Sequence, residues 1–544
     1  MDTGKIFVRP ASGLVKAIST WGAILFGIHC ISLSSSGFIP FSWVASVWPG
    51  ANIIGLLTIA MLTSLLHGYV YASIGGAMPR AGADYVLASR VLSPIPAFVA
   101  SFTLVVFSGI VAGGLVAWIP KSALPALLQP VGIIFKNQTY LSWASYSSSS
   151  QGSLVIGSIC VLLVFGLTLL PTKTVLKILS LGLVLGLGAW LVIFYSLIAS
   201  SGPQAFREAW NHFVGTTSSL AKFDNVVPLA HAAGMTISHN PATMTVAGLI
   251  MGFWIYYGYY IPTFFAGEVQ TGKTSRSFII ASWSSIIVTW LVFVIGVYLL
   301  ERLVPQEWIA AEGYLANNPD AVTKVAGQPV LALPWITFYA AILKPRAILV
   351  LFTAFAWVYT LINLVQTYFF YSSRIIFAWS FDRVVPGFLS ALNPRTKTPI
   401  YSLIVIALLA EIGVIDAARG GPLGTQLAFA FFAVVTQLVS VLAITLFPYR
   451  RPTEFRLCPS FMRGRLFGIP AITIAGTATL LYLFWMIVAS FLFPAVGVPN
   501  PGRTLLLLFV IAAAGLLVFL TARWYRRKYE GIEITAVYQE APPA

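Results

Sequence analysis

The sequence predicts an all-α integral membrane protein with twelve transmembrane helices, and three observations carry that prediction. Of the 544 residues, 58% are hydrophobic and only 9% are charged, with a mean hydropathy of +0.87; a soluble domain would carry roughly 25% charged residues. The apolar residues gather in stretches of about 20, the length of helix that crosses a bilayer. Most of the Lys and Arg residues lie between these stretches.

The predicted spans divide the chain into four regions. In chain order, the spans are 17–41, 51–77, 95–119, 152–171, 175–199, 244–266, 278–303, 346–379, 400–418, 425–448, 468–494 and 503–523. The regions are an N-terminus (1–16), a ten-helix core (17–448), the last two spans with the loop before them (449–523), and a soluble tail with little order (524–544).

The distribution of basic residues orients these spans. If both termini are cytoplasmic, the inner segments hold 22 of the 32 Lys and Arg residues. Cytoplasmic loops carry an excess of these residues, so the asymmetry supports the span count and the orientation together. Two long outer segments, 200–243 and 304–345, are expected to form short surface helices.

Other classes of protein are disfavoured. The net charge of +16 would suit nucleic acid, but no basic cluster with interleaved aromatics is present, so we expect no nucleic-acid partner. The three cysteines and five histidines form no metal-ligand or disulfide pattern, so no metal or cofactor is expected. A membrane enzyme would need clustered His, Asp or Glu at membrane depth, and the sequence has none.

The sixth span contains a predicted break. It reads GFWIYYGYYIPTFFAGEV from residue 252 to 269. Pro262 lacks an N–H and disturbs the turn before it, and Gly258 relaxes the backbone there. Non-helical backbone at membrane depth is tolerated only where it is buried or lines a cavity. The alternative reading is a simple proline kink surrounded by packing tyrosines.

The first span carries a matching interruption. It reads TWGAILFGIHCISLSSSGFIPFSW and holds Ser32, the run Ser34–Gly37, and Pro40. Transporters built from inverted repeats interrupt corresponding helices of the two halves, and spans one and six correspond in a five-plus-five repeat.

Four segments resemble the amino acid–polyamine–organocation (APC) superfamily. They are WPGANI at 48–53, AMPRAGADYVLASR at 77–90, the sixth-span segment FWIYYGYYIPTFFAGEV, and SSRIIFAWSFDRVVPGFLSALNPRTKTPI at 372–400. The resemblance implies a leucine-transporter-like fold with broken helices 1 and 6. Substrate would bind between the two breaks, and spans three, eight and ten would complete the cavity.

The resemblance also implies site residues. In the sixth span it assigns an aromatic gate to Trp254 and the unwound segment to Tyr256, Tyr257 and Gly258. In the first span it assigns the substrate-binding break to Ser34, Ser35, Ser36 and Gly37, and a rival alignment to the family places that break at Gly27–His29. Many relatives carry a glutamate two residues after the sixth-span glycine. Here that position is Tyr260, which we include in the candidate site although it does not supply a carboxylate.

The coupling ion is left open between proton and sodium. His29 in span one is a candidate for proton coupling, with a neutral interhelical hydrogen bond as the alternative; His67 in span two has the same two readings. Thr360 in span eight could contribute a hydroxyl to a sodium site. Four inner-loop residues are expected to form an ion-pair network, with simple solvation as the alternative: Arg80, Asp84, Arg374 and Asp382.

Taken together, these features predict a secondary active transporter of amino acids in the cell membrane. An aromatic, uncharged pocket would favour neutral or apolar substrates. The expected partners are an amino acid, a coupling ion and the lipid bilayer. A polyamine or other organic-amine transporter, and a non-transporting sensor with a transporter fold, are the alternatives.

Overall fold

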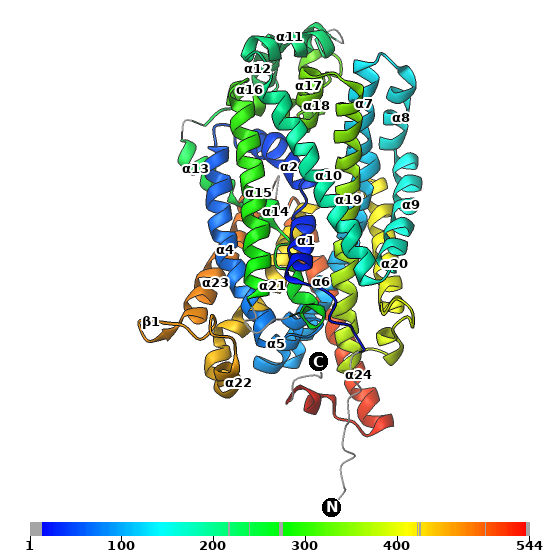
Figure 1. The fold of residues 1–544 in the computed structure, drawn as a ribbon, viewed down its shortest axis with the longest axis vertical. Helices are drawn as coiled ribbons and strands as arrows, with labels where there is room; N and C mark the ends of the chain where they lie inside the picture. Colours follow the sequence, from blue (N-terminus) through cyan, green and yellow to red (C-terminus); the bar gives the residue numbers. More distant parts are fainter. Residues whose placement is uncertain are drawn as a thin grey trace, which may run out of the picture.

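The computed structural model describes residues 13–215, 218–238, 240–270, 276–421, 423, 426–494 and 497–539. Most of the predicted N-terminus (1–12) and the end of the tail (540–544) lie outside the described residues. Figure 1 shows long helices that stand together in one bundle, with a group of short helices over one end and others at the opposite end. These two ends correspond to the outer and inner segments of the predicted topology.

Within the described ranges, eleven helices are long and apolar enough to cross a membrane. The first is a run of α1 (Thr20–Ile31), α2 (Ser35–Ile39), η1 (Pro40–Val44) and α3 (Ala45–Val47), and the third is a run of α6 (Pro94–Trp118), η2 (Ile119–Ala123) and α7 (Leu124–Ile134). The others are α4 (Ile53–Ala77), α9 (Ser150–Thr168), α10 (Thr172–Ile198), α15 (Ser277–Glu301), α19 (Ala347–Phe381), α20 (Ile400–Ala418), α21 (Gln426–Arg450), α23 (Ala471–Leu492) and α24 (Pro501–Tyr525).

The sixth predicted span, 244–266, differs from the others. It is divided among α13 (Pro241–Ala247), α14 (Leu249–Tyr256) and the 3₁₀ helix η4 (Ile261–Phe264), which η5 (Ala266–Glu268) follows. None of these pieces is long enough to cross a bilayer alone. Of the twelve spans that the sequence predicts, eleven therefore correspond to helices or helical runs long enough to cross a membrane.

The bundle is held together by apolar packing, and its outer surface is also apolar. Within it, α6 packs on α20, α4 on α15, α10 on α19, and α21 on α23. Large apolar side chains such as Leu162, Leu191 and Phe509 are nevertheless more than 60% exposed. An exposed apolar surface of this extent is unfavourable in water and suits contact with lipid.

The short helices form two end regions (Figure 1). The cap comprises α11 (Pro203–Phe213), η3 (Ser219–Ala221), α12 (Phe223–Ala232), α16 (Gln306–Asn317), α17 (Pro319–Ala326) and α18 (Ile336–Leu343), with α8 (Gln138–Ser148) beside it. The opposite end holds α5 (Ala83–Val91), η6 (Gly387–Ser390), α22 (Pro452–Leu457), the antiparallel strands β1 (Arg465–Leu466) and β2 (Ile469–Pro470), η7 (Arg526–Glu530) and η8 (Ile534–Gln539). The predicted outer segments thus do contain short helices.

A buried carboxyl group lies in the cap. Glu312 of α16 is fully buried, and its Oε1 accepts a hydrogen bond from the N–H of Leu333 at 2.6 Å, whereas its Oε2 has no partner. The hydroxyl of Tyr339 nearby also has no partner. Burial raises the pKa of Glu312 from 4.5 to about 8, because the charged form is poorly solvated there.

This carboxyl predicts a pH-dependent stability. A raised folded-state pKa contributes stability that is complete below pH 4.5 and is lost as the pH rises towards 8. We expect the free energy of unfolding of the wild-type protein to fall between pH 5 and pH 8, by about 1.4 kcal/mol per pH unit for this group, and the apparent Tm to fall with it. The variant Glu312→Gln should lack that component and be the more stable of the two at pH 8, as thermal unfolding in detergent would show. Parallel curves for the two proteins would contradict the prediction.

Candidate functional site

The first membrane helix is interrupted at Ser32. α1 ends at Ile31, and Ser32 takes a left-handed conformation with φ 65° and ψ 113° before α2 begins at Ser35. The Ser32 Oγ accepts a hydrogen bond from the N–H of Ser35 at 3.2 Å and lies 3.1 Å from the Ser34 Oγ. Serine hydroxyls thus replace part of the helical hydrogen bonding that the interruption removes.

The register of this break differs from the prediction. The break covers residues 32–34, so the predicted segment Ser34–Gly37 overlaps it only at Ser34, and the rival position Gly27–His29 lies inside α1 and is wrong. Gly37 serves packing instead, because a Cβ there would lie 2.7 Å from Trp190 Cζ2. The Trp190 Nε1 in turn donates to the Leu33 carbonyl at 3.1 Å.

The second interruption follows Tyr256. α14 ends there, Tyr257 is extended with φ −56° and ψ 129°, and Gly258 has φ 117°. The chain then tightens into η4, with Pro262 in its first turn and a hydrogen bond from the Ile261 N–H to the Gly258 carbonyl at 3.0 Å. This is the place where the sequence predicts a break, and the positive φ explains why a glycine stands there.

The two interruptions touch each other. A Cβ on Gly258 would lie 2.6 Å from Cys30 Sγ and 2.7 Å from both the carbonyl carbon and the Cβ of Cys30. The backbone of the sixth predicted span therefore approaches the end of α1 at a distance that no side chain permits. The two interruptions therefore lie against each other inside the bundle.

A cavity of about 270 Å³ lies at this meeting point. It is lined by Cys30, Ile31, Ser35, Ser36, Leu115, Trp254, Tyr257, Leu364 and Tyr368. None of these side chains is acidic or basic, and the hydroxyl groups come from both breaks and from α19. The Ser36 Oγ donates to the Ile31 carbonyl at 2.5 Å, so it faces the end of α1. The lining therefore offers hydroxyl groups and apolar surface without a charged side chain.

Four of the nine predicted site residues line the cavity, namely Ser35, Ser36, Trp254 and Tyr257. The others have different surroundings: Ser34 lines a neighbouring cavity, Gly37 packs on Trp190, and Gly258 packs on Cys30. The Tyr256 hydroxyl donates to the Leu57 carbonyl at 3.1 Å, and the Tyr260 hydroxyl accepts from Gln437 Nε2 at 2.6 Å.

Sequence reasoning missed Cys30, Ile31, Leu115, Leu364 and Tyr368. Leu115 and Leu364 lie in uniform apolar runs and carry no local signal. Cys30 and Ile31 adjoin the true break and would have been found with its correct register. α6 and α19 are the third and eighth predicted spans, which were expected to complete the cavity; α21, the tenth, contributes none of the lining residues.

A second cavity of about 460 Å³ continues from the first towards the cap. Both cavities include Ser35, and the second is also lined by Ser34, Phe38, Trp118, Trp335, Trp357 and several smaller residues. The rings of Phe38, Trp43 and Trp118 pack edge to face, with centroids 5.8–6.4 Å apart. The second cavity is thus lined by aromatic, hydroxyl-bearing and small apolar side chains, and it adjoins the first at Ser35.

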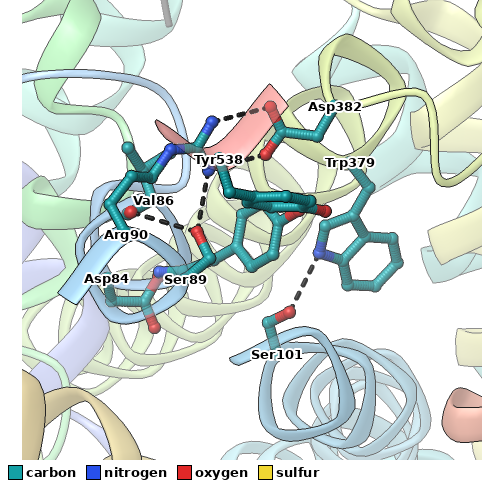
Figure 2. Close-up of polar contacts among 9 residues, drawn as sticks. Asp84, Val86, Ser89, Arg90, Ser101, Trp379, Asp382 and Tyr538 are labelled. Carbon is teal, nitrogen blue, oxygen red and sulfur yellow. Dashed lines mark hydrogen bonds and ion pairs between the residues drawn. The ribbon is translucent and has the colours of Figure 1, made fainter. Parts of the chain in front are cut away.

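The inner side is closed by two buried ion pairs. Arg374 donates to both carboxylate oxygens of Glu268, with its Nε at 2.8 Å and its Nη2 at 3.2 Å. Arg90 donates to both oxygens of Asp382 at 2.7 and 2.8 Å (Figure 2). All four side chains are at most 2% exposed. Such pairs form only where the geometry is complete, because each buried charge would otherwise be unsolvated.

The predicted inner-loop network is thus partly wrong. Arg374 and Asp382 are in ion pairs, but their partners are Glu268 and Arg90 and not one another. Asp84 accepts a hydrogen bond from the Tyr85 N–H at 2.7 Å, and the Arg80 Nη1 donates to the Pro79 carbonyl. Asp84 lies in the first turn of α5 and is 3% exposed.

The C-terminal tail also closes the inner side. The sequence predicts a soluble tail with little order, but Ile534, Val537 and Tyr538 of η8 are buried. The Tyr538 ring lies 4.8 Å from the Arg90 guanidinium (Figure 2). The Tyr538 hydroxyl lies 2.9 Å from that of Tyr85. The tail therefore packs against the protein through these three side chains, and the expectation of little order does not hold for η8.

The candidate ion-coupling residues lie on α1 and α19. The His29 Nε2 is 2.7 Å from the Leu179 carbonyl, and the Thr360 hydroxyl donates within its own helix to Ala356 and Trp357 carbonyls. Asn363, three residues after Thr360 on α19, is 1% exposed and has no partner for either polar side-chain atom. Within the described part of the chain, no group of three His, Cys, Asp or Glu residues could hold a metal ion.

Comparison with known proteins agrees with this geometry. No curated protein matches the chain. A family model described as amino acid permease matches residues 18–516, which covers both interruptions, the cavity and the inner ion pairs. This match confirms the resemblance to APC-superfamily permeases, a family of membrane transporters and not of enzymes. The chain therefore belongs to the amino acid permease family.

Proposed function

We propose that this protein is a secondary active transporter that carries neutral or apolar amino acids across the cell membrane by alternating access. The observation that carries the proposal is the uncharged cavity between the two helix breaks. Carbonyl groups at the end of α1 suit a substrate ammonium group, and N–H groups near Gly258 suit a carboxylate. Trp254, Leu115 and Leu364 offer apolar contacts to a side chain.

The arrangement of closed and open sides supports alternating access. Two buried ion pairs and the C-terminal tail seal the inner side, whereas the substrate cavity adjoins a second cavity towards the cap. Transport then requires an inward-open state in which these ion pairs separate. Both termini are proposed to be cytoplasmic, because the inner segments hold most of the basic residues.

The alternative substrates fit the cavity less well. A polyamine carries several ammonium groups and calls for acidic side chains, and none of the nine residues lining the cavity is acidic. A sensor without transport would not need a second cavity that leads away from the binding site. These contrasts favour an amino acid over an organic polycation.

Uptake by purified protein tests the proposal. Proteoliposomes should receive a panel of labelled amino acids and one labelled diamine, with an inward proton gradient or a matched sodium gradient. We expect accumulation of at least one neutral amino acid and none of the diamine. Accumulation of the diamine alone would favour the polyamine reading, and neither uptake nor exchange by folded protein would favour the sensor.

A substitution at Trp254 tests the site itself. Trp254→Ala is expected to weaken substrate affinity by about 10- to 100-fold, since a large apolar side chain contributes roughly 1.5–3 kcal/mol when buried against a partner. The matched control is Trp143→Ala, because Trp143 lies on α8 and is 56% exposed. The measurement is the KM of uptake, and equal KM values for the two variants would remove Trp254 from the site.

A further inference from the structure

A row of buried polar side chains, called the file below, extends from the cavity; it runs through Tyr257, Tyr260, His67 and Tyr71 to Asp84. The Tyr257 ring, which lines the cavity, lies 5.4 Å from that of Tyr260. Tyr260 in turn lies 5.4 Å from the imidazole of His67 and 4.6 Å from Tyr71, and these last two rings are 4.7 Å apart. His67 and Tyr71 lie one turn apart on α4, so the file turns there towards the inner end.

The hydrogen bonding of this file is incomplete. The His67 Nδ1 is 2.6 Å from the Tyr259 hydroxyl, whereas its Nε2 faces the Gln437 side chain and makes no complete hydrogen bond. The Tyr71 hydroxyl and the Gln437 Oε1 also have none, although all three side chains are at most 2% exposed. An unsatisfied buried polar group costs about 1–3 kcal/mol, so several in one place point to a function.

The file ends at Asp84 in a separate cavity of about 200 Å³ between α5, α6 and α21. Asp84 is 3% exposed and, among the described residues, no Lys or Arg pairs with it. The Ser440 side chain lies beside both Asp84 and Tyr71, and Ser101 and Thr436 complete the polar lining. Asp84 lies on the same short helix as Arg90 of the inner ion pair (Figure 2).

The titratable groups around this file are few. His67 faces Tyr71, which lies on the same helix. It also faces Tyr259 and Tyr260, which follow α14. Tyr482 of α23 lies near Tyr259. Asp84 lies near Tyr71 of α4 and next to Tyr85 on its own helix. Tyr85 in turn contacts Tyr538 of η8. The Arg90–Asp382 pair lies at the same end of the bundle. Burial raises the pKa of Asp84 from 3.8 to about 7, so its carboxyl can both take and release a proton near neutral pH.

We propose that His67, Tyr71 and Asp84 form a proton-transfer path from the substrate cavity to the inner face, which makes the proton the coupling ion of this transporter. The inference rests on the proposed transport function. The imidazole Nε2 of His67 takes up the proton and then releases it to the Tyr71 hydroxyl, which returns the imidazole to its neutral form. The Tyr71 and Ser440 hydroxyls each accept one proton as they release another. The Asp84 carboxylate then receives the proton and delivers it to the cytoplasm when the inner ion pairs separate.

Parallel measurements of accumulation, proton flux and exchange test this path. Asp84→Asn and His67→Gln are expected to lose proton-driven accumulation and substrate-linked proton flux by about 100-fold, the scale of a removed proton-transfer group. Exchange of internal for external substrate at equal pH should stay within about twofold, since neither side chain lines the cavity. Asp84→Glu retains the carboxyl and should keep both activities, and the exposed Glu208→Gln serves as the control.

The possible outcomes separate the two proposals. If wild-type protein transports substrate with no accompanying proton flux, or if the Asp84 and His67 variants accumulate substrate as wild type does, the proton path is wrong and transport stands. If wild-type protein neither accumulates nor exchanges substrate, the proposed function itself fails. If Asp84→Asn does not fold, the proton flux of the wild type and the behaviour of His67→Gln still decide the question.

Discussion

Replacing Gly258 with alanine is expected to abolish transport, with a loss of at least about 100-fold in uptake rate. Two independent costs add at this position. The backbone has φ 117°, which side-chain-bearing residues adopt only at a cost of about 1–3 kcal/mol. The new Cβ would also lie 2.7 Å from the backbone carbonyl carbon of Cys30, which no rotamer change can relieve. Together they exceed the 2.8 kcal/mol or so that corresponds to 100-fold.

The control for this variant is another glycine of the membrane region. Gly166 lies in α9 at a helical position with open space around it, so Gly166→Ala should leave uptake unchanged. Comparing the two variants by uptake, and by monodispersity in detergent, separates a defect at the breaks from poor folding. Uptake by folded Gly258→Ala at the wild-type rate would show that the contact between the two interruptions is dispensable.

The sequence predicts the fold well where a single rule applies. Bilayer thickness requires about 20 apolar residues per helix, and this rule locates α4, α15 and α20 within a few residues. Pro262 and Gly258 locate the second interruption because each restricts the backbone in a known way. The first interruption was misplaced because it depends on Ser32, a residue with no intrinsic preference for a left-handed conformation, and its local hydrogen bonds decide the register.

The site is less predictable, because it depends on contacts between distant segments. Leu115 and Leu364 are indistinguishable in sequence from lipid-facing leucines, and only the packing of α6 and α19 turns them towards the cavity. The partners of the inner ion pairs are 106 residues apart for Arg374 and Glu268, and 292 residues apart for Arg90 and Asp382. No local pattern reveals pairs at such separations.

Removing one partner of a buried inner ion pair is expected to open the inner side. Asp382→Asn leaves the Arg90 guanidinium buried without its counter-charge, which typically costs about 3–5 kcal/mol. In an inward-open state Arg90 would be hydrated, so the cost falls mainly on the closed state. The equilibrium should therefore move towards the open state by roughly two to three orders of magnitude, and accumulation of substrate should be lost.

The cysteines of the chain provide the measurement. All three are buried, and Cys30 lines the substrate cavity, so Cys160→Ala and Cys458→Ala leave one reporter. In Asp382→Asn, this reporter should react rapidly with a membrane-impermeant thiol reagent added from the cytoplasmic side. The exposed pair Arg207–Asp224 is the control, because surface pairs contribute only about 0–1 kcal/mol and Asp224→Asn should leave Cys30 protected.

An exchange of charges separates the loss of the pair from the loss of a particular residue. The double variant Arg90→Asp with Asp382→Arg keeps one charge of each sign on facing elements, and it should recover part of the protection that Asp382→Asn removes. Tyr538 would still cover the site but would face a carboxylate, so recovery should be incomplete. If Cys30 stays unreactive in Asp382→Asn, the inner closure depends on Arg374–Glu268 and the tail, and the same experiment on Glu268→Gln then shows which of those two holds it.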